Sequence, residues 1–267
     1  MVFIDFEGPA TLLRTMRVLI GTRAAVVLVL GVLSASVVAG ADVRTVVGAF
    51  VGRVATADLR DLIIDQTLDV YDPQGRYRQA RIDQRLFIKM PGRQRLEQTV
   101  DGVREVQIIA DGRMWSRQGD GKVEAGSIKR QRDTARLLLP VARSIDDVLG
   151  EWRALGVRQE VAHTSRLLQR PVTIVGAFAG DRESPSVWLD DRYGVIRLVT
   201  REKLPTGPAL VDLTFSEHRP LTGDLFFPYR QEAFVNGRLQ LLIVVRSIAV
   251  NTKLADTLFD PNLLTAR

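Results

Sequence analysis

Short runs of alternating apolar and polar residues fill most of the chain from about residue 60 onward. In the run 62–70, apolar residues alternate with acidic and polar ones, and this period of two is typical of a half-buried strand. Tight-turn sequences separate the runs, as at Asp111-Gly112 and Asn236-Gly237, where Gly accepts the positive φ that a two-residue hairpin turn requires. The pattern therefore predicts many strands joined by hairpins.

Two stretches show helical spacing instead. Val43, Val46, Val47, Phe50 and Val54 recur at steps of three and four within a predicted helix over 42–60. A second helical region spans 131–155, broken at Pro140, and its later part starts at an N-cap, Ser144. We therefore expect a mainly β (α+β) fold, in which helices lie on one face of a large curved antiparallel sheet.

The turn residues mark where each predicted strand begins and ends. They cover residues 62–70, 76–90, 93–100, 104–109, 116–118, 122–128, 167–178, 186–190, 195–202, 210–216, 229–235 and 238–250, with strands resuming at His163 and a loop through Pro220 and Gly223. No composition shift marks a linker, so residues 42–267 are predicted to form a single domain.

The strand 239–250 is apolar on both sides. Strict alternation places Leu241, Ile243 and Val245 on one face, and the other face carries Leu242, Val244, Ile248 and Val250. One interpretation is a central strand of a sandwich. The other is a half-barrel whose concave lining binds an acyl chain.

The N-terminal segment has the features of a Sec-type signal peptide. Residues 24–41 carry no charge, Arg14, Arg17 and Arg23 precede them, and Ala39-Gly40-Ala41 ends them with small residues. We predict that residues 1–41 are a leader with its natural start at Met16, cleaved after Ala41, and that the mature protein is periplasmic. The alternative is an uncleaved anchor, residues 24–41, in the inner membrane.

The composition excludes several kinds of chemistry. The chain has no Cys and only two His residues outside any ligand-spaced cluster, which argues against thiolate catalysis and a metal site. It contains neither a G-x-S-x-G elbow nor a Gly-rich phosphate loop. The net charge is +6, but the basic residues are interspersed with acidic ones rather than clustered. Basic and aromatic residues do not interleave as they do in nucleic-acid binders. We therefore predict no enzyme activity, no cofactor and no nucleic-acid partner.

Several local motifs, in their order along the chain, resemble the LolA/LolB-like family of periplasmic outer-membrane lipoprotein carriers and lipoprotein-sorting proteins. The motifs are Ile88-Lys89-Met90-Pro91-Gly92-Arg93-Gln94-Arg95, Asp111-Gly112-Arg113-Met114-Trp115, Val187-Trp188-Leu189-Asp190 with Gly194 and Arg197, and Leu258-Phe259-Asp260-Pro261 after Val250-Asn251. Met90 stands where the carrier proper has an Arg before the Pro, so lipoproteins and other lipids are equally compatible ligands.

The resemblance implies an unclosed β-barrel lidded by helices, with an apolar cavity for lipid or lipoprotein acyl chains and no catalysis. It also implies two protein partners, an inner-membrane exporter and an outer-membrane acceptor. An alternative function is an envelope regulatory or interaction module that binds a membrane partner. We expect the cavity to be lined by Ile88, Met90, Val106, Ile108, Trp152, Leu241 and Ile243.

Overall fold

The computed structural model describes residues 42–100, 102–117, 119–127 and 134–264. The predicted leader, residues 1–41, lies outside these ranges. Within them, no helix is both long enough and apolar enough to cross a membrane.

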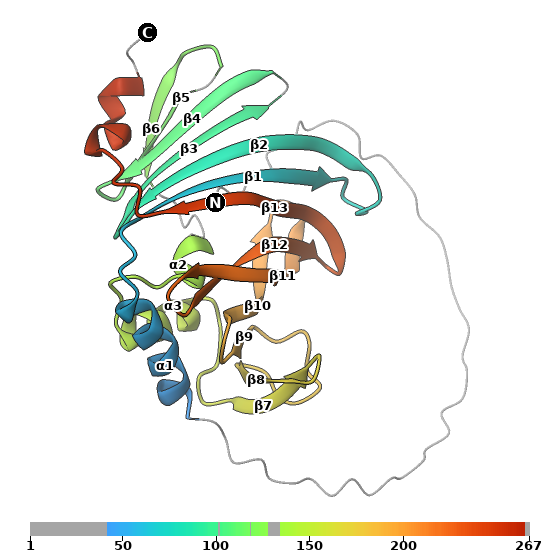
Figure 1. Cartoon of the computed structure of the whole chain (residues 1–267). Helices are drawn as coiled ribbons and strands as arrows, with labels where there is room; N and C mark the ends of the chain where they lie inside the picture. Colours follow the sequence, from blue (N-terminus) through green and yellow to red (C-terminus); the bar gives the residue numbers. More distant parts are fainter. Residues whose placement is uncertain (1–41, 101, 118, 128–133, 265–267) are drawn as a thin grey trace, which may run out of the picture.

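One antiparallel sheet of 13 strands forms the body of the protein (Figure 1). Its spatial order is β6-β5-β4-β3-β2-β1-β13-β12-β11-β10-β9-β8-β7, so chain neighbours pair as hairpins and only β1 with β13 joins distant segments. The strands are β1 Asp61–Tyr71, β2 Arg78–Lys89, β3 Arg93–Val100, β4 Val103–Ala110, β5 Arg113–Arg117, β6 Val123–Ser127, β7 Ala162–Leu167, β8 Arg170–Val175, β9 Ser186–Asp190, β10 Gly194–Leu204, β11 Gly207–Thr222, β12 Leu225–Val235 and β13 Arg238–Val250.

The sheet curls without closing, and β6 and β7 are its two edges. The predicted fold class, a large curved antiparallel sheet with few helices, is confirmed. Three α-helices, α1 Val43–Thr56, α2 Thr134–Leu138 and α3 Ile145–Ala154, gather at one end of the half-barrel (Figure 1). Two 3₁₀ helices, η1 Asp256–Phe259 and η2 Pro261–Leu264, follow β13 and lie beside the edge that contains β4 to β6.

Side chains at the helix starts explain where α1 and α3 begin. The Asp42 carboxylate accepts a hydrogen bond from the Arg44 backbone N–H at 3.1 Å. At α3, the Ser144 hydroxyl accepts from the Asp147 N–H while the Asp147 carboxylate accepts from the Ser144 N–H, which makes a capping box. The predicted N-cap at Ser144 is therefore confirmed, whereas α1 stops at Thr56, four residues before the predicted end.

Two hairpins differ from the prediction. The run 167–178 was expected to be one strand interrupted at Pro171, but Leu168 and Gln169 adopt positive φ values and turn the chain between β7 and β8. The predicted loop through Pro220 is strand, because β11 runs to Thr222. The turn at Leu168 and Gln169 was missed because such a pair rarely adopts this backbone, whereas the loop at Pro220 was predicted because a Pro usually ends a strand.

A bulge in β13 changes which residues share a face. Gln66 of β1 pairs with Val245, and the preceding Asp65 pairs with Ser247, so Arg246 is an extra residue. The extra residue shifts the alternation, and Ile248 therefore joins the face that carries Ile243 and Val245. Val250 shifts with it. Their predicted assignment to the opposite face is wrong, because strict alternation does not anticipate a bulge.

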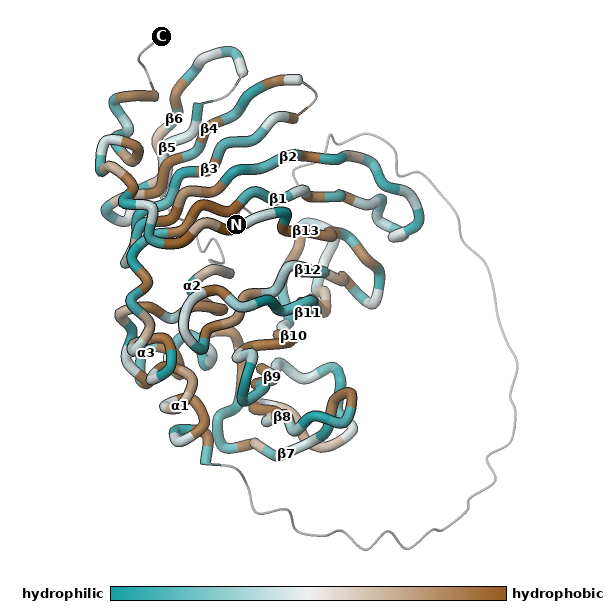
Figure 2. Tube along the Cα trace, viewed as in Figure 1, coloured by the Kyte–Doolittle hydropathy of each residue, from teal (hydrophilic) through white to brown (hydrophobic). Residues whose placement is uncertain are grey.

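The two faces of the sheet have different compositions. The main hydrophobic cluster lies on the concave face and joins strand residues to the three α-helices. The convex face carries many ion pairs, among them the two-pronged contacts of Arg81 with Asp69 and of Arg197 with Asp212. Figure 2 shows hydrophobic residues gathered at the ends of β1 to β3 nearest the helices, while the β1–β2 hairpin is hydrophilic. The core therefore sits at the helix-covered end of the concave face.

Candidate functional site

The concave face near the helices is a continuous apolar surface drawn from many strands. Cross-strand partners lie on the same face of a sheet, so the observed register identifies its members. Leu62 pairs with both Ile88 and Val250, and Leu198 pairs with Val187 and Leu213. The buried strand residues of this surface are Leu62, Ile64, Leu86, Ile88, Leu96, Val175, Val187, Leu189, Val195, Leu198, Val211, Leu213, Phe215, Leu225, Phe227, Ala233 and Val245.

The helices cover part of this surface with their apolar stripes. Val47 and Phe50 of α1 and Trp152 of α3 are at least 95% buried in the same cluster. Gly194, at the start of β10, lets α1 approach closely, because a Cβ there would lie 2.7 Å from the ring of Phe50. Between α1 and α3, the Arg44–Asp146 ion pair at 2.7 Å is largely exposed. Arg53 of α1 also donates a hydrogen bond to the Asp191 carbonyl oxygen between β9 and β10, so polar contacts accompany the apolar packing of this cover.

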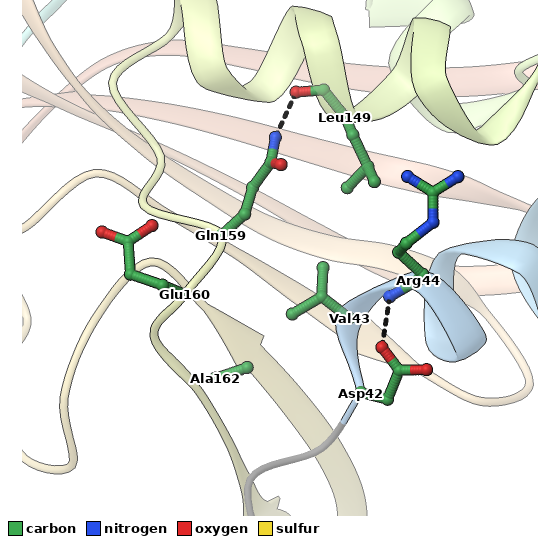
Figure 3. A pocket seen from close by; sticks show the side chains of 7 residues that line it. All are labelled: Asp42, Val43, Arg44, Leu149, Gln159, Glu160 and Ala162. Carbon is green, nitrogen blue, oxygen red and sulfur yellow. Dashed lines mark hydrogen bonds between the residues drawn. The ribbon is translucent and has the colours of Figure 1, made fainter.

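A cleft opens between the first turn of α1, α3 and the segment before β7 (Figure 3). Its volume is about 380 Å³, within the range of small-ligand pockets. Polar residues Asp42, Arg44, Gln159 and Glu160 line it, together with the apolar Val43, Leu149 and Ala162, and these three belong to or pack on the main cluster. The cleft is thus a polar-rimmed opening at the margin of the apolar face.

A row of amide side chains crosses the concave face from β1 to β4. Gln66 Nε2 donates to Gln84 Oε1 at 2.9 Å, Gln84 Nε2 donates to Gln98 Oε1 at 2.6 Å, and Gln98 Nε2 donates to Glu105 Oε2 at 2.7 Å. Gln66 and Gln84 are almost fully buried. The row separates the main cluster from a second apolar cluster of Leu68, Val70, Ile82 and Ile243. Sequence reasoning missed these amides, since isolated Gln residues in strands carry no motif.

Five of the seven residues predicted to line a cavity lie on the concave side. Ile88 and Trp152 are buried in the main cluster, and Met90 packs against it. Ile243 belongs to the second cluster, and Leu241 contacts both. The structure therefore brings these five to one surface, spread over its two apolar clusters.

The other two, Val106 and Ile108, face the opposite side of the sheet. Gln107, between them, pairs with Leu96 of the concave cluster, so its two neighbours point to the convex face. There they pack with Ala110 and with Leu264 of η2, and Trp115 packs against the group. This patch is covered by the C-terminal tail, and the structure does not bring it into the concave lining. The apolar residues of the C-terminal tail were the sequence feature that could have predicted this second cover.

The titratable side chains near the sheet are the other candidates for a functional site. Within the described ranges, no group of three or more His, Asp or Glu residues could hold a metal ion. His218, stacked on Tyr193 with ring centroids 4.5 Å apart, is largely buried, and burial lowers its pKa to about 4. It is therefore neutral at physiological pH and lies outside both concave clusters. The concave face offers an apolar lining, a row of neutral amides and the Glu105 carboxylate on which that row ends.

Comparisons with known proteins give matches to solved structures alone. No family model and no curated protein matches this sequence. A putative outer membrane lipoprotein-sorting protein domain from Vibrio parahaemolyticus is 12% identical, with a TM-score of 0.52 over 82% of this chain and 97% of that one. A DUF1329 family protein from Desulfovibrio piger is 12% identical, with a TM-score of 0.53 over 84% and 99%.

A LolA superfamily protein from Nitrosomonas europaea is similar in the same way. It is 7% identical, with a TM-score of 0.54 over 83% of this chain and 99% of that one. Nearly the whole of each solved structure is therefore matched by this chain. Identities this low establish the fold alone, and the chain has the fold of the LolA superfamily and of lipoprotein-sorting domains, as its motifs predicted.

Proposed function

We propose that this protein is a carrier or binding protein for acyl chains, which it takes up on the concave face of its half-barrel. The observation that carries the proposal is the continuous apolar surface of that face, which the helices cover in part through buried apolar side chains. Displacing such a cover exposes apolar surface that an acyl chain can bury. Each buried CH₂ contributes about 0.8 kcal/mol and needs no specific polar partner.

The setting and the partners are part of the same proposal. The chain acts in the periplasm after removal of residues 1–41, without catalysis and without a cofactor. Its ligand is the acyl portion of a lipoprotein or of another lipid, received from an inner-membrane exporter and passed to an outer-membrane acceptor. The putative lipoprotein-sorting domain from Vibrio parahaemolyticus, which shares this fold, supports this choice of ligand.

The first experiment asks whether the purified protein holds lipid. Native mass spectrometry and solvent extraction are expected to reveal a bound lipid, and a fluorescent fatty acid is expected to bind to protein stripped of it. A lipid-free protein that also fails to bind the fluorescent fatty acid would refute the proposal.

A matched pair of variants then locates the binding face. Leu241 is on the concave side, while its neighbour Leu242 pairs with Asp69 and Glu232 on the convex side. Leu241→Ala is expected to weaken binding of the fluorescent fatty acid by roughly five- to tenfold, because about 1 kcal/mol of apolar contact is lost. Leu242→Ala is the control and is expected to leave the dissociation constant unchanged. Equal effects of the two substitutions would place the ligand elsewhere.

A further inference from the structure

Gln231 of β12 is a buried amide in the middle of the concave face. It pairs with Ile243 of β13 on one side and with Phe215 of β11 on the other, and both partners are buried. Its own side chain is 4% exposed. Phe215 belongs to the main cluster and Ile243 to the second cluster, so Gln231 lies where the two apolar regions meet.

The carbonyl oxygen of this amide has no hydrogen-bond donor. Among the described residues, none reaches Gln231 Oε1. A buried acceptor without a donor destabilises a protein, because it has lost its hydrogen bond to water and gained none in return. Native structures contain few such groups, and each one calls for a specific explanation.

The other amides of the same face show that this chain can satisfy such groups internally. Gln66, Gln84 and Gln98 donate in series along β1, β2 and β3, and the series ends on the Glu105 carboxylate. Gln231 lies two strands away from Gln66, about 10 Å at the usual strand spacing, and takes no part in the row. Its cross-strand neighbours are both apolar, Ile243 on one side and Phe215 on the other.

We infer that Gln231 is a specificity-determining residue, whose Oε1 accepts a hydrogen bond from an O–H or N–H group carried by the acyl ligand. The inference rests on the proposed function and adds the ligand class to it. The preferred ligand is an acyl or alkyl chain with a hydroxyl or an amide N–H at its polar end. A ligand with acceptors alone, such as a simple ester, leaves Gln231 Oε1 unpaired and binds less tightly. The apolar clusters on either side of Gln231 hold the chain.

The test compares three ligands of equal chain length on the full-length protein. Hexadecanol carries an O–H donor, N-methylpalmitamide carries an N–H donor, and methyl palmitate carries no donor. Their dissociation constants are measured by displacement of a fluorescent fatty acid. The two donor ligands are expected to bind about tenfold more tightly than methyl palmitate, which corresponds to one net hydrogen bond.

The variant Gln231→Leu removes the acceptor and keeps a similar volume. In this variant the donor advantage, which is the dissociation constant of methyl palmitate divided by that of a donor ligand, is expected to fall from about ten to about one. The fall comes from weaker binding of hexadecanol and N-methylpalmitamide, while the dissociation constant of methyl palmitate stays unchanged. The matched control is Gln240→Leu. Gln240 is also buried, but its Nε2 donates to the Asp72 carbonyl oxygen at 3.1 Å, and the donor advantage is expected to persist.

Each outcome bears on one of the two proposals. Equal binding of the three ligands to the native protein overturns the role of Gln231 and leaves the acyl-binding function standing. Preference for methyl palmitate overturns it too, because the amide would then act as a donor. A donor advantage that survives in Gln231→Leu assigns the selectivity to another residue. If none of the three ligands displaces the fluorescent fatty acid, the proposed function fails and this inference fails with it. Should Gln231→Leu not fold, Gln231→Met serves in its place.

Discussion

Two apolar regions on opposite faces of the sheet, the main concave cluster and the convex cluster around Ile108, are covered in different ways. The concave region is covered by helices α1 to α3, which contact it through buried apolar side chains such as Phe50 and Trp152. The convex region, around Ile108, is covered by the C-terminal tail through Leu264. The tail is fastened through the buried carboxylate of Asp61, whereas the polar contacts of α1 include an exposed ion pair of Arg44 with Asp146 and a hydrogen bond from Arg53 to the Asp191 carbonyl oxygen.

The fastening of the tail begins where β13 ends. The Asp61 carboxylate accepts hydrogen bonds from the backbone N–H groups of Thr252, Lys253 and Leu254 and from the Thr252 hydroxyl. Further on, Lys89 and Arg93 both contact Asp256 at 2.7 Å. A cover held by directional bonds to specific backbone groups is fixed in place. A cover held mainly by non-directional apolar contact can exchange those contacts for similar ones with a ligand. The comparison therefore favours the helices over the tail as the cover that a ligand would displace.

The largest effect is expected at the tryptophan of α3. Trp152 is 1% exposed in the main cluster, and Trp152→Ala should lower the free energy of unfolding by about 3–5 kcal/mol, because it leaves a large cavity. Urea unfolding of Trp115→Ala provides the comparison, since Trp115 is only partly buried on the convex side. A larger loss for Trp115→Ala would reverse the ranking of the two regions.

The next effect concerns the region under the tail. Ile108→Ala should lower the free energy of unfolding by about 2–4 kcal/mol, because the side chain is fully buried. Leu264→Ala should also lower the free energy of unfolding. The two losses should not be additive, and a double-mutant cycle should give a coupling energy of about 0.5–3 kcal/mol. Neither substitution should change the affinity for the fluorescent fatty acid. Weaker binding in Ile108→Ala would mean that the convex region takes part in ligand uptake.

The smallest effect is expected at the fastening of the tail. Burial acts to raise the pKa of the Asp61 carboxyl, but its hydrogen bonds outweigh burial and leave the pKa below the ordinary value. The native state therefore favours the ionised form. The contribution of the Asp61 carboxylate to the free energy of unfolding is fully present above about pH 4. It is lost as the pH falls through the lowered native pKa. Asp61→Ala should lower stability by about 1–3 kcal/mol at pH 7.

The pH dependence is the control for this last variant. Unfolding measured between pH 7 and pH 3 should show a shallower acid-induced loss in Asp61→Ala than in the native chain, because one low-pKa carboxylate has been removed. Parallel curves would show that Asp61 is not tied to the tail in solution.

Local sequence features predicted the elements well where they carry strong signals. Asp111-Gly112 and Asn236-Gly237 form hairpin turns between β4 and β5 and between β12 and β13, and both turns contain the positive φ that Gly permits. Ser144 caps α3. The turn at Leu168 and Gln169 was missed, because neither residue favours a positive φ and the surrounding structure imposes it.

The face on which each strand residue lies could be predicted only in part. Alternation correctly grouped Leu241 with Ile243, but the bulge at Arg246 moved Ile248 and Val250 to their face. Val106 and Ile108 alternate as cleanly as lining residues do, yet they point to the tail. Periodicity shows that two residues share a face, and it does not show which face is concave.

The sequence by itself determined that this chain forms many antiparallel strands with two helical interruptions, because turn chemistry and the period of apolar residues are local properties. Tertiary structure alone decided which apolar faces meet the helices, which meets the tail, and which buried amide is left without a donor. Those outcomes depend on the register between strands distant in sequence, above all β1 with β13, and on the curvature of the sheet. Gln231 illustrates the point, since a glutamine in a strand acquires significance only when its neighbours across the sheet are known.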